Sequence, residues 1–205
     1  DLLIQAESGL IDVSGSPEGI GRIGVSICDI GAGMAANAGI VEALLLRERF
    51  HKVKDVKISL FDVAADWMTV PYIHSKYGGA APKRVGLKHP SIAPYGAFLS
   101  SENTSFIISI QNELEWGRFC LDVLKTPTLA KDNKFSSNTL RVKNRDLLDE
   151  TVQSILISLT DETLKNRLEE ASIAYGRLNS VKDLERHLAL KKINVRNSLD
   201  DILTI

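Results

Sequence analysis

The sequence predicts an α/β fold, and three observations support this class. Between residues 24 and 78, apolar segments typical of buried strands alternate with segments of helical periodicity, the order expected of an open α/β sheet. Residues 78–100 then hold three prolines and four glycines, too many for a regular element. With 44% hydrophobic and 25% charged residues among 205, the composition suits one or two globular domains.

The first half of the chain predicts two strand–helix pairs. Residues 24–28 form a short apolar run that predicts a buried strand, and residues 31–49, rich in Ala and Leu, predict a helix packed on most of its faces. Residues 56–62 alternate and predict a second strand. Residues 62–78 predict a helix that is interrupted before Pro71.

The second half predicts a smaller unit that follows a loop over residues 78–100. FIISI (106–110) reads as a short buried strand, and residues 112–124 as an amphipathic helix that Thr126 and Pro127 end. The core candidates on that helix are Leu114, Phe119, Leu121 and Leu124. Further helices are expected over 145–159, over 160–171 opening with Thr160, and over 180–190.

Charge and cysteine usage exclude several classes of function. Lys and Arg number 25 against 26 Asp and Glu, and no basic segment carries interleaved aromatic residues, so we expect no nucleic-acid partner. Cys28 and Cys120 lie far apart with no CxxC spacing and no His cluster, which predicts neither a disulfide framework nor a metal site and suits a reducing, cytoplasmic location. No apolar run approaches the roughly 20 residues that span a bilayer, so no membrane segment is expected.

Asp29 is the first functional candidate, because it lies where the predicted strand gives way to the predicted helix. In one interpretation its carboxylate accepts backbone N–H bonds at the start of the helix, as many aspartates do. In the other, the carboxylate is exposed at the carboxyl end of a strand, the usual ligand position in open α/β sheets, and acts as nucleophile or acid–base group. The position alone does not separate the two.

Neighbouring nucleophiles and bases are weaker candidates. Cys28 is expected to be a buried structural thiol facing away from Asp29, because successive residues of a strand point to opposite faces. His74 and His89 lack an identifiable orienting partner, so each is expected to lie at the surface or to pack.

The glycine-rich loop is the last candidate from the residues themselves. GGAAPKRVG lacks the spacings of phosphate-binding loops and is expected to be a solvated loop. Arg84 and Lys88, near Gly78 and Gly79, could still receive an anionic substrate.

Several segments, in order, resemble one protein family. These segments are DLLIQAESGLIDVSG, GRIGVSICDIGAGMAANAGIVEALLLRE, KISLFD, RVGLKHPSIAPYGAF and IAYGRLNSVKDLERH. They resemble the family III CoA-transferases (the CaiB/BaiF family), which include formyl-CoA and carnitine CoA-transferases and the α-methylacyl-CoA racemases. The resemblance covers nearly the whole chain.

The resemblance implies a specific role for Asp29. In the transferases the matching aspartate attacks an acyl-CoA thioester, forms a mixed anhydride and then an aspartyl-CoA thioester, and passes CoA to an incoming acid. CoA and acyl-CoA are substrates, and the family uses no permanently bound cofactor and no metal. The small residues that flank Asp29 would make room for the thioester.

The resemblance also implies an architecture and an assembly. We expect residues 1–77 to be part of a Rossmann-like large domain, 78–170 a linker and a small α+β domain, and 171–205 a return toward the large domain. Family members form interlocked homodimers. They are considerably longer and begin with a nucleotide-binding-like half, so the chain is expected to be a piece of a longer protein.

Two alternatives to CoA transfer stay open. The racemases pair the equivalent aspartate with an upstream histidine and carry a Glu-Pro pair where this chain reads IQNELEW, so transferase is favoured. Departures from the family pattern at 50–53, 102–103 and 187–188 remove turn residues and keep a non-catalytic remnant as the other alternative.

The substrate expectation comes from the loop and from IAYGRLN. These segments look most like the branch that acts on C4 and C5 dicarboxylic acids such as succinate, mesaconate, citramalate or itaconate. Arg84, His89 and Tyr95 are expected to contact the acid or acyl group, with Gly78 and Gly79 shaping the loop.

Overall fold

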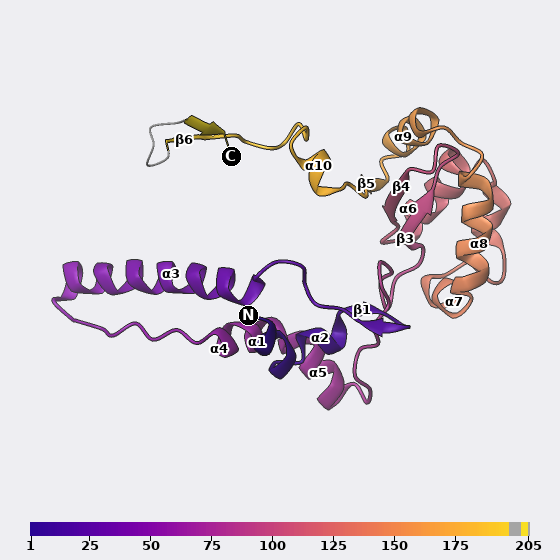
Figure 1. Ribbon diagram of the computed structural model, residues 1–205. Coiled ribbons are helices and arrows are strands. Elements are labelled where there is room, and N and C mark those ends of the chain that lie inside the picture. Colours follow the sequence, from indigo (N-terminus) through magenta and orange to yellow (C-terminus); the bar gives the residue numbers. More distant parts are fainter. Residues whose placement is uncertain (197–201, 205) are drawn as a thin grey trace. The chain divides into compact units, whose positions relative to one another are not determined.

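The computed structural model describes residues 1–196 and 202–204, which form two compact units, Asp1–Ser91 and Ile92–Ile205 (Figure 1). Helices and strands occur together, as the predicted fold class requires. The division at Ser91 and the expected domain boundary at 77 differ by the loop 78–91, which belongs to the first unit.

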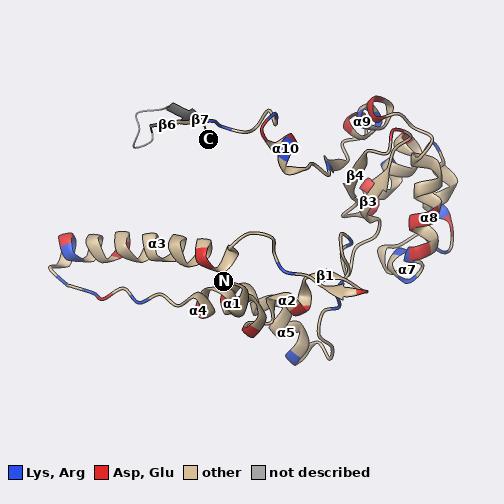
Figure 2. Cartoon of the chain, viewed as in Figure 1, with Lys and Arg blue, Asp and Glu red and all other residues tan. Residues whose placement is uncertain are grey.

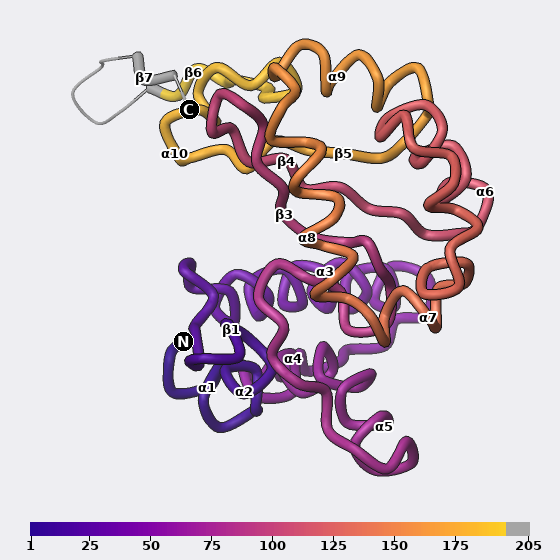
Figure 3. Tube along the Cα trace, turned by 90° about the vertical axis from the view of Figure 1, so that its right-hand side faces the viewer, coloured from indigo at the N-terminus to yellow at the C-terminus, as the bar shows by residue number. Residues whose placement is uncertain are grey.

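The first unit is built mainly of helices. Its regular elements are α1 (Leu2–Glu7), α2 (Leu10–Val13), the short antiparallel pair β1 (Gly15–Ser16) and β2 (Gly19–Ile20), α3 (Ile27–Phe50), α4 (Leu60–Trp67) and α5 (Thr69–Tyr77). Figures 1 and 3 both show α4 running beside the start of α3, where the side chains of Val63 and Trp67 lie against Gly31.

The strand predicted over 24–28 does not form, and this expectation was wrong. Helix α3 begins at Ile27, four residues before the expected start at Gly31, and Ser26 is its N-cap. A short apolar run fits a buried strand and a buried helical turn equally well. Here Cys28, fully buried, and the partly buried Ile27 place the first turn of α3 on the core of this unit.

The strand predicted over 56–62 was also wrong. Residues 51–59 are irregular, and α4 begins at Leu60, where the Ser59 hydroxyl accepts a hydrogen bond from the Asp62 N–H at 3.2 Å. This N-cap decides the start of the helix against the alternating pattern. The predicted interruption before Pro71 is confirmed, since α4 and α5 are separated at Met68.

The core of the first unit is small. Leu10, Cys28 and Ala64 are buried, and the hydrophobic residues packed against them are Ile4, Ile23, Ile27, Leu60 and Met68. Beyond its first turns α3 presents large apolar side chains to solvent: Met34, Ile40, Val41, Leu44, Leu45 and Phe50. Figure 2 shows its charges gathered mainly toward its two ends. The expectation that α3 is packed on most faces is therefore not met within the described residues.

By length and composition alone, α3 could cross a membrane. This corrects the expectation that no run is long and apolar enough. The core helix of a protein without membrane segments passes the same test, so the finding carries no further conclusion.

The second unit packs helices on one antiparallel sheet. Strand order is β3 (Tyr95–Leu99), β4 (Ser105–Ser109) and β5 (Ala174–Arg177). The helices are α6 (Glu113–Arg118), which continues as one π turn η1 (Phe119–Val123), the 3₁₀ turn η2 (Pro127–Lys131), α7 (Asn138–Lys143), α8 (Arg145–Leu156), α9 (Asp161–Glu170) and α10 (Val181–Leu184). β6 (Asn194–Arg196) pairs with β7 (Ile202–Thr204).

Most predicted elements of this unit are confirmed, but the helix expected over 180–190 is limited to Val181–Leu184, and the core face of residues 112–124 was partly wrong. Phe119 and Leu124 are buried, whereas Leu114 and Leu121 are 82% and 53% exposed. The buried positions are Trp116, Phe119, Cys120, Val123 and Leu124. They recur at helical spacing, and Leu114 and Leu121 lie on the opposite face.

A fully buried arginine ties the second unit together. The Arg141 guanidinium donates to Glu113 at 2.8 Å and to the backbone carbonyls of Ala93 and Phe135 at 2.7 and 3.1 Å. It also lies 5.0 Å from the ring centre of Trp116, a cation–π contact. A buried charge is tolerated only when it is paired and hydrogen-bonded in this way.

Candidate active site

Asp29 lies in the first turn of α3, as its third residue. Its side chain is 53% exposed, while the preceding Cys28 is fully buried. Because Ser26 is the N-cap, Asp29 does not have the N-cap role considered from the sequence. A carboxylate at this end of a 24-residue helix interacts favourably with the helix dipole while it stays accessible to a ligand.

The start of α3 is held by a residue 27 positions earlier in the chain. The Cys28 N–H donates to the Asp1 carboxylate at 2.8 Å, whereas the side chain of Ser26 makes no capping bond. The Asp1 backbone nitrogen lies 4.0 Å from Asp29 Oδ1. Among the described residues no side chain forms a hydrogen bond or an ion pair with the Asp29 carboxylate.

The two glycines that follow Asp29 have different surroundings. A Cβ at Gly31 would lie 2.4 Å from the Trp67 ring, so this glycine serves the close packing of α3 on α4. A Cβ at Gly33 would meet no atom within 4 Å. Because residues four apart lie on the same helix face, the surface beside Asp29 is open at Gly33. Of the two, only Gly33 matches the expected room for a thioester.

The cysteines and His89 have structural surroundings that do not indicate catalysis. Cys28 is a buried thiol, as predicted, although on a helix rather than a strand. Burial raises the pKa of the Cys120 thiol to about 12, which keeps it neutral. His89 accepts a hydrogen bond at Nδ1 from the Ser91 N–H at 3.2 Å, a local turn contact.

Arg84 is engaged within the first unit. Its guanidinium contacts the Asp12 carboxylate at 3.2 Å, the Asp12 carbonyl at 3.0 Å and the Ser16 carbonyl at 3.3 Å. The Asp12 side chain is 72% exposed, so this pair lies at the surface. The Asp12 carboxylate pairs with the Arg84 guanidinium in the way that the carboxylate of a small acid would. Such an acid would have to displace Asp12 to bind Arg84.

The remaining predicted residues have backbone roles in this structure. Gly78 ends α5, where a Cβ would lie 2.7 Å from the His74 carbonyl oxygen, and Gly79 has a φ of 81°. Both positions favour glycine, in keeping with the predicted shaping of the loop. Tyr95 is the first residue of β3 and pairs with Ser109 in the second unit. The other five predicted site residues lie in the first unit.

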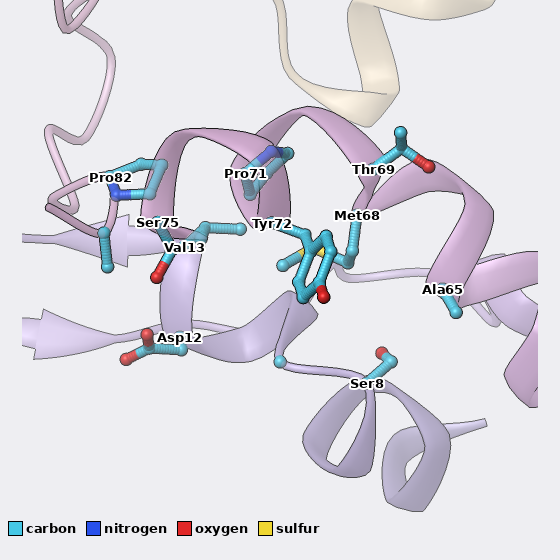
Figure 4. Close-up of a pocket in the computed structure, with 12 residues that line it drawn as sticks. Ser8, Asp12, Val13, Ala65, Met68, Thr69, Pro71, Tyr72, Ser75 and Pro82 are labelled. Atoms are coloured by element: carbon cyan, nitrogen blue, oxygen red, sulfur yellow. The ribbon is translucent and has the colours of Figure 1, made fainter. Parts of the chain in front are cut away.

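The first unit contains several pockets that were not anticipated from the sequence, and two of them lie beside α4. The first, an open pocket of about 450 Å³, is lined by the turn between α1 and α2 and by α2, α4, α5 and the loop that follows α5 (Figure 4). Its lining residues are Ser8, Gly9, Asp12, Val13, Ala65, Met68, Thr69, Pro71, Tyr72, Ser75, Ala81 and Pro82. The second, of about 370 Å³, lies between α3 and α4 and is bordered by Gly31 and Trp67. Their linings come from several elements, so no single sequence pattern marks them.

No group of three or more His, Cys, Asp or Glu side chains that could hold a metal ion occurs in residues 1–196 and 202–204.

The chain is similar to known proteins along nearly its whole length. A family model described as CoA-transferase family III matches residues 1–202. An acetyl-CoA:oxalate CoA-transferase of Acetobacter aceti is 30% identical over 185 residues, which are 88% of this chain and 46% of that protein. A succinyl-CoA:glutarate CoA-transferase of Mus musculus is 31% identical over 188 residues, 90% of this chain and 42% of that protein. The chain thus spans less than half the length of these curated relatives.

Solved structures agree on the fold. A CaiB/BaiF family protein from Brucella suis superposes with a TM-score of 0.79 at 28% identity, covering 99% of this chain and 57% of that chain. A protein from Mycobacterium tuberculosis superposes with a TM-score of 0.82 at 21% identity, covering 100% of this chain and 55% of that chain. The second likeness shows the fold alone.

Proposed function

The chain belongs to CoA-transferase family III, and from this premise we propose that its protein transfers coenzyme A from an acyl-CoA to a small carboxylic acid, with Asp29 as the nucleophile. The observation that carries the proposal is the exposed Asp29 carboxylate in the first turn of α3, beside the open face at Gly33. Several curated relatives are named as CoA-transferases, which supports the class of reaction.

The first half of the reaction moves CoA onto the protein. The Asp29 carboxylate attacks the thioester carbonyl of the acyl-CoA, the C–S bond breaks, and a mixed anhydride and a CoA thiolate result. The thiolate then attacks the Asp29 carbonyl of the anhydride. The donor acid leaves as a carboxylate that carries one oxygen from Asp29, and Asp29 becomes a CoA thioester.

The second half repeats these steps in reverse with a new acid. The acceptor carboxylate attacks the Asp29 thioester, releases the CoA thiolate and forms a second anhydride. The thiolate attacks the acceptor carbonyl, so the new acyl-CoA leaves and Asp29 regains its charge with one oxygen from the acceptor. Atoms and charges balance without a redox partner.

The local structure suits a nucleophile that carries a large group in turn. The positive end of the α3 dipole favours the carboxylate before attack and after release. A glycine inside a helix costs up to about 1 kcal/mol relative to alanine, and no packing within this chain requires it at Gly33. Clearance for a bound acyl-CoA explains why the position lacks a side chain.

We propose a short dicarboxylic acid as the substrate. Relatives are named for oxalate, glutarate, mesaconate and citramalate. Arg84 would bind the second carboxylate by exchanging Asp12 for it, and His89 of the same unit would contact the acyl group. Acceptors that differ only in the distal carboxylate test this: kcat/KM should favour the dicarboxylic member, and equal values would contradict the proposal.

The role of Asp29 is tested by substitution with a matched control. Asp29→Asn should lower kcat/KM for CoA transfer by roughly 10³-fold or more, because the amide is a poor nucleophile. Asp62→Asn is the control, since Asp62 is also the third residue of an exposed helix start in the same unit. It should leave the transfer rate nearly unchanged.

Trapping separates the proposed chemistry from the alternatives. Hydroxylamine added after acyl-CoA should convert Asp29 to a hydroxamate that mass spectrometry detects, while Asp62 stays unmodified. Exchange of the substrate α-proton with solvent deuterium without this modification would instead support a racemase. If neither the modification nor the exchange is observed, the result would support a non-catalytic remnant.

A further inference from the structure

We propose that Gln5 and Asp1 act as positioning residues for Asp29, by fixing the first turn of α3 from which the reacting carboxylate projects. This inference rests on the nucleophilic role proposed above for Asp29. It explains why the polar side chain of Gln5 is buried, which the packing of α1 alone does not.

Gln5 is fully buried although its side chain is polar. Its Oε1 accepts the Ile23 N–H at 3.0 Å, and its Nε2 donates to the Ile23 carbonyl at 3.4 Å. The side-chain amide thus replaces a strand partner for the backbone just before α3. Since a backbone N–H can only donate, this contact also fixes which end of the amide carries the oxygen.

The same amide nitrogen continues the connection to α3. Gln5 Nε2 donates to Asp1 Oδ2 at 2.6 Å, and Asp1 Oδ1 accepts the Cys28 N–H at 2.8 Å. Asp1 thereby supplies the cap that Ser26 does not provide. Gln5 holds the approach to the helix at Ile23 and, through Asp1, its second residue.

The consequence for Asp29 follows from its own lack of side-chain restraint. Its carboxylate is half exposed, and within the described residues no side chain forms a hydrogen bond or an ion pair with it. The backbone of the first turn therefore sets the position from which the carboxylate projects. A shift of about 1 Å in a reacting group can lower a rate by 10²-fold.

The test uses the whole protein and a matched pair of variants. Gln5→Met keeps the side-chain size and removes all three hydrogen bonds. Gln153→Met is the control, because Gln153 makes the same two-way bond with the Leu99 backbone, at 2.8 and 2.9 Å, in the second unit. Gln5→Met should lower kcat by about 10- to 100-fold with KM changed less than about twofold. Gln153→Met should lower stability without this loss of kcat.

A third variant gives a readout that a merely structural role would not move. Gln5→Glu keeps the acceptor for Ile23 but donates to Asp1 only when it is protonated, a form that burial and the adjacent carboxylate favour. Its kcat relative to the unsubstituted protein should therefore rise as the pH is lowered. A ratio that does not change with pH would overturn the proposal.

Hydrogen exchange distinguishes failure of this inference from failure of the proposed function. The Ile23 and Cys28 amides should exchange faster in Gln5→Met than in Gln153→Met, whether or not the protein transfers CoA. Equal protection of these amides in the two variants would show that Gln5 does not fix the first turn of α3, and would overturn the inference. Faster exchange in a protein that shows no CoA transfer would reject the proposed function and, with it, the positioning role. The hydrogen bonds of Gln5 and Asp1 would then remain a feature of the fold alone.

Discussion

Asp29 and Cys28 are neighbours in sequence, yet one side chain is half exposed and the other is fully buried. Successive residues on a helix differ in direction by about 100°, so the first turn of α3 turns the thiol into the core and leaves the carboxylate outside. The sequence correctly predicted that the Cys28 thiol is buried. It placed Cys28 on a strand and Asp29 at the end of that strand, because periodicity does not resolve so short an apolar run.

Arg84 shows what residue patterns leave out. The sequence predicts a cation near a glycine-rich loop, and the structure adds that Asp12 already engages it. Gln5 could not be recognised as important, since a glutamine within an amphipathic helix looks like a surface residue. Its partners Ile23 and Asp1 meet it only after the chain has folded back.

Acid stability of the second unit is predicted from Glu113. The hydrogen bond from Arg141 holds the pKa of this carboxyl below its ordinary value of 4.5. A lowered folded-state pKa contributes stability that is fully present above the unfolded value and is lost as the pH falls through the folded value. Unfolding of this unit should therefore become easier below about pH 4.5.

Glu113→Gln tests this assignment directly. It leaves the buried Arg141 charge without its ion-pair partner, so the free energy of unfolding near pH 7 should fall by about 1–3 kcal/mol, toward the lower end because Glu113 is half exposed. The acid-dependent loss should also become smaller. Glu115→Gln removes a charge from the same helix turn without an arginine partner and serves as control. An unaltered pH dependence in Glu113→Gln would contradict the assignment.

At the scale of elements, helix caps decide where helices begin more reliably than hydrophobic patterns do. The Ser59 cap starts α4 within a segment whose alternation predicts a strand. The predicted Thr160 cap is confirmed, with its hydroxyl accepting the Thr163 N–H at 3.2 Å. Strand β5 could not be read locally, because its pairing with β4 joins residues far apart in sequence. Strand β3 forms a hairpin with β4, so the expectation that residues 78–100 hold no regular element was wrong at Tyr95–Leu99.

The two glycines of α3 should respond with opposite signs to the same substitution. Gly31→Ala places a methyl group against Trp67 and should destabilise the first unit by about 1–3 kcal/mol. Gly33→Ala enters open space within a helix and should stabilise it by about 0.5–1 kcal/mol. Denaturant unfolding of both variants measures the difference. Destabilisation by Gly33→Ala would show that an unrecognised contact fills the space beside Asp29.

At the scale of the whole molecule, most of the assignment came from the order of the motifs. The mixed fold class and the family are confirmed, because the resembling segments run along nearly the entire chain and the family model matches residues 1–202. The pockets beside α4 and the exposed apolar face of α3 were not predicted, since they depend on how several elements pack. The relatives are more than twice as long as the segment they share with this chain.

Oxygen transfer to Asp29 tests the central claim most directly. The proposed steps leave one oxygen of the acceptor acid on Asp29 in each turnover, so an acceptor labelled with ¹⁸O in its carboxylate should label the peptide 23–47, which contains Asp29 as its one aspartate. The label should appear only when acyl-CoA is present, and the peptide 58–76, which contains Asp62, should stay unlabelled. CoA transfer without ¹⁸O in the Asp29 peptide would contradict the account.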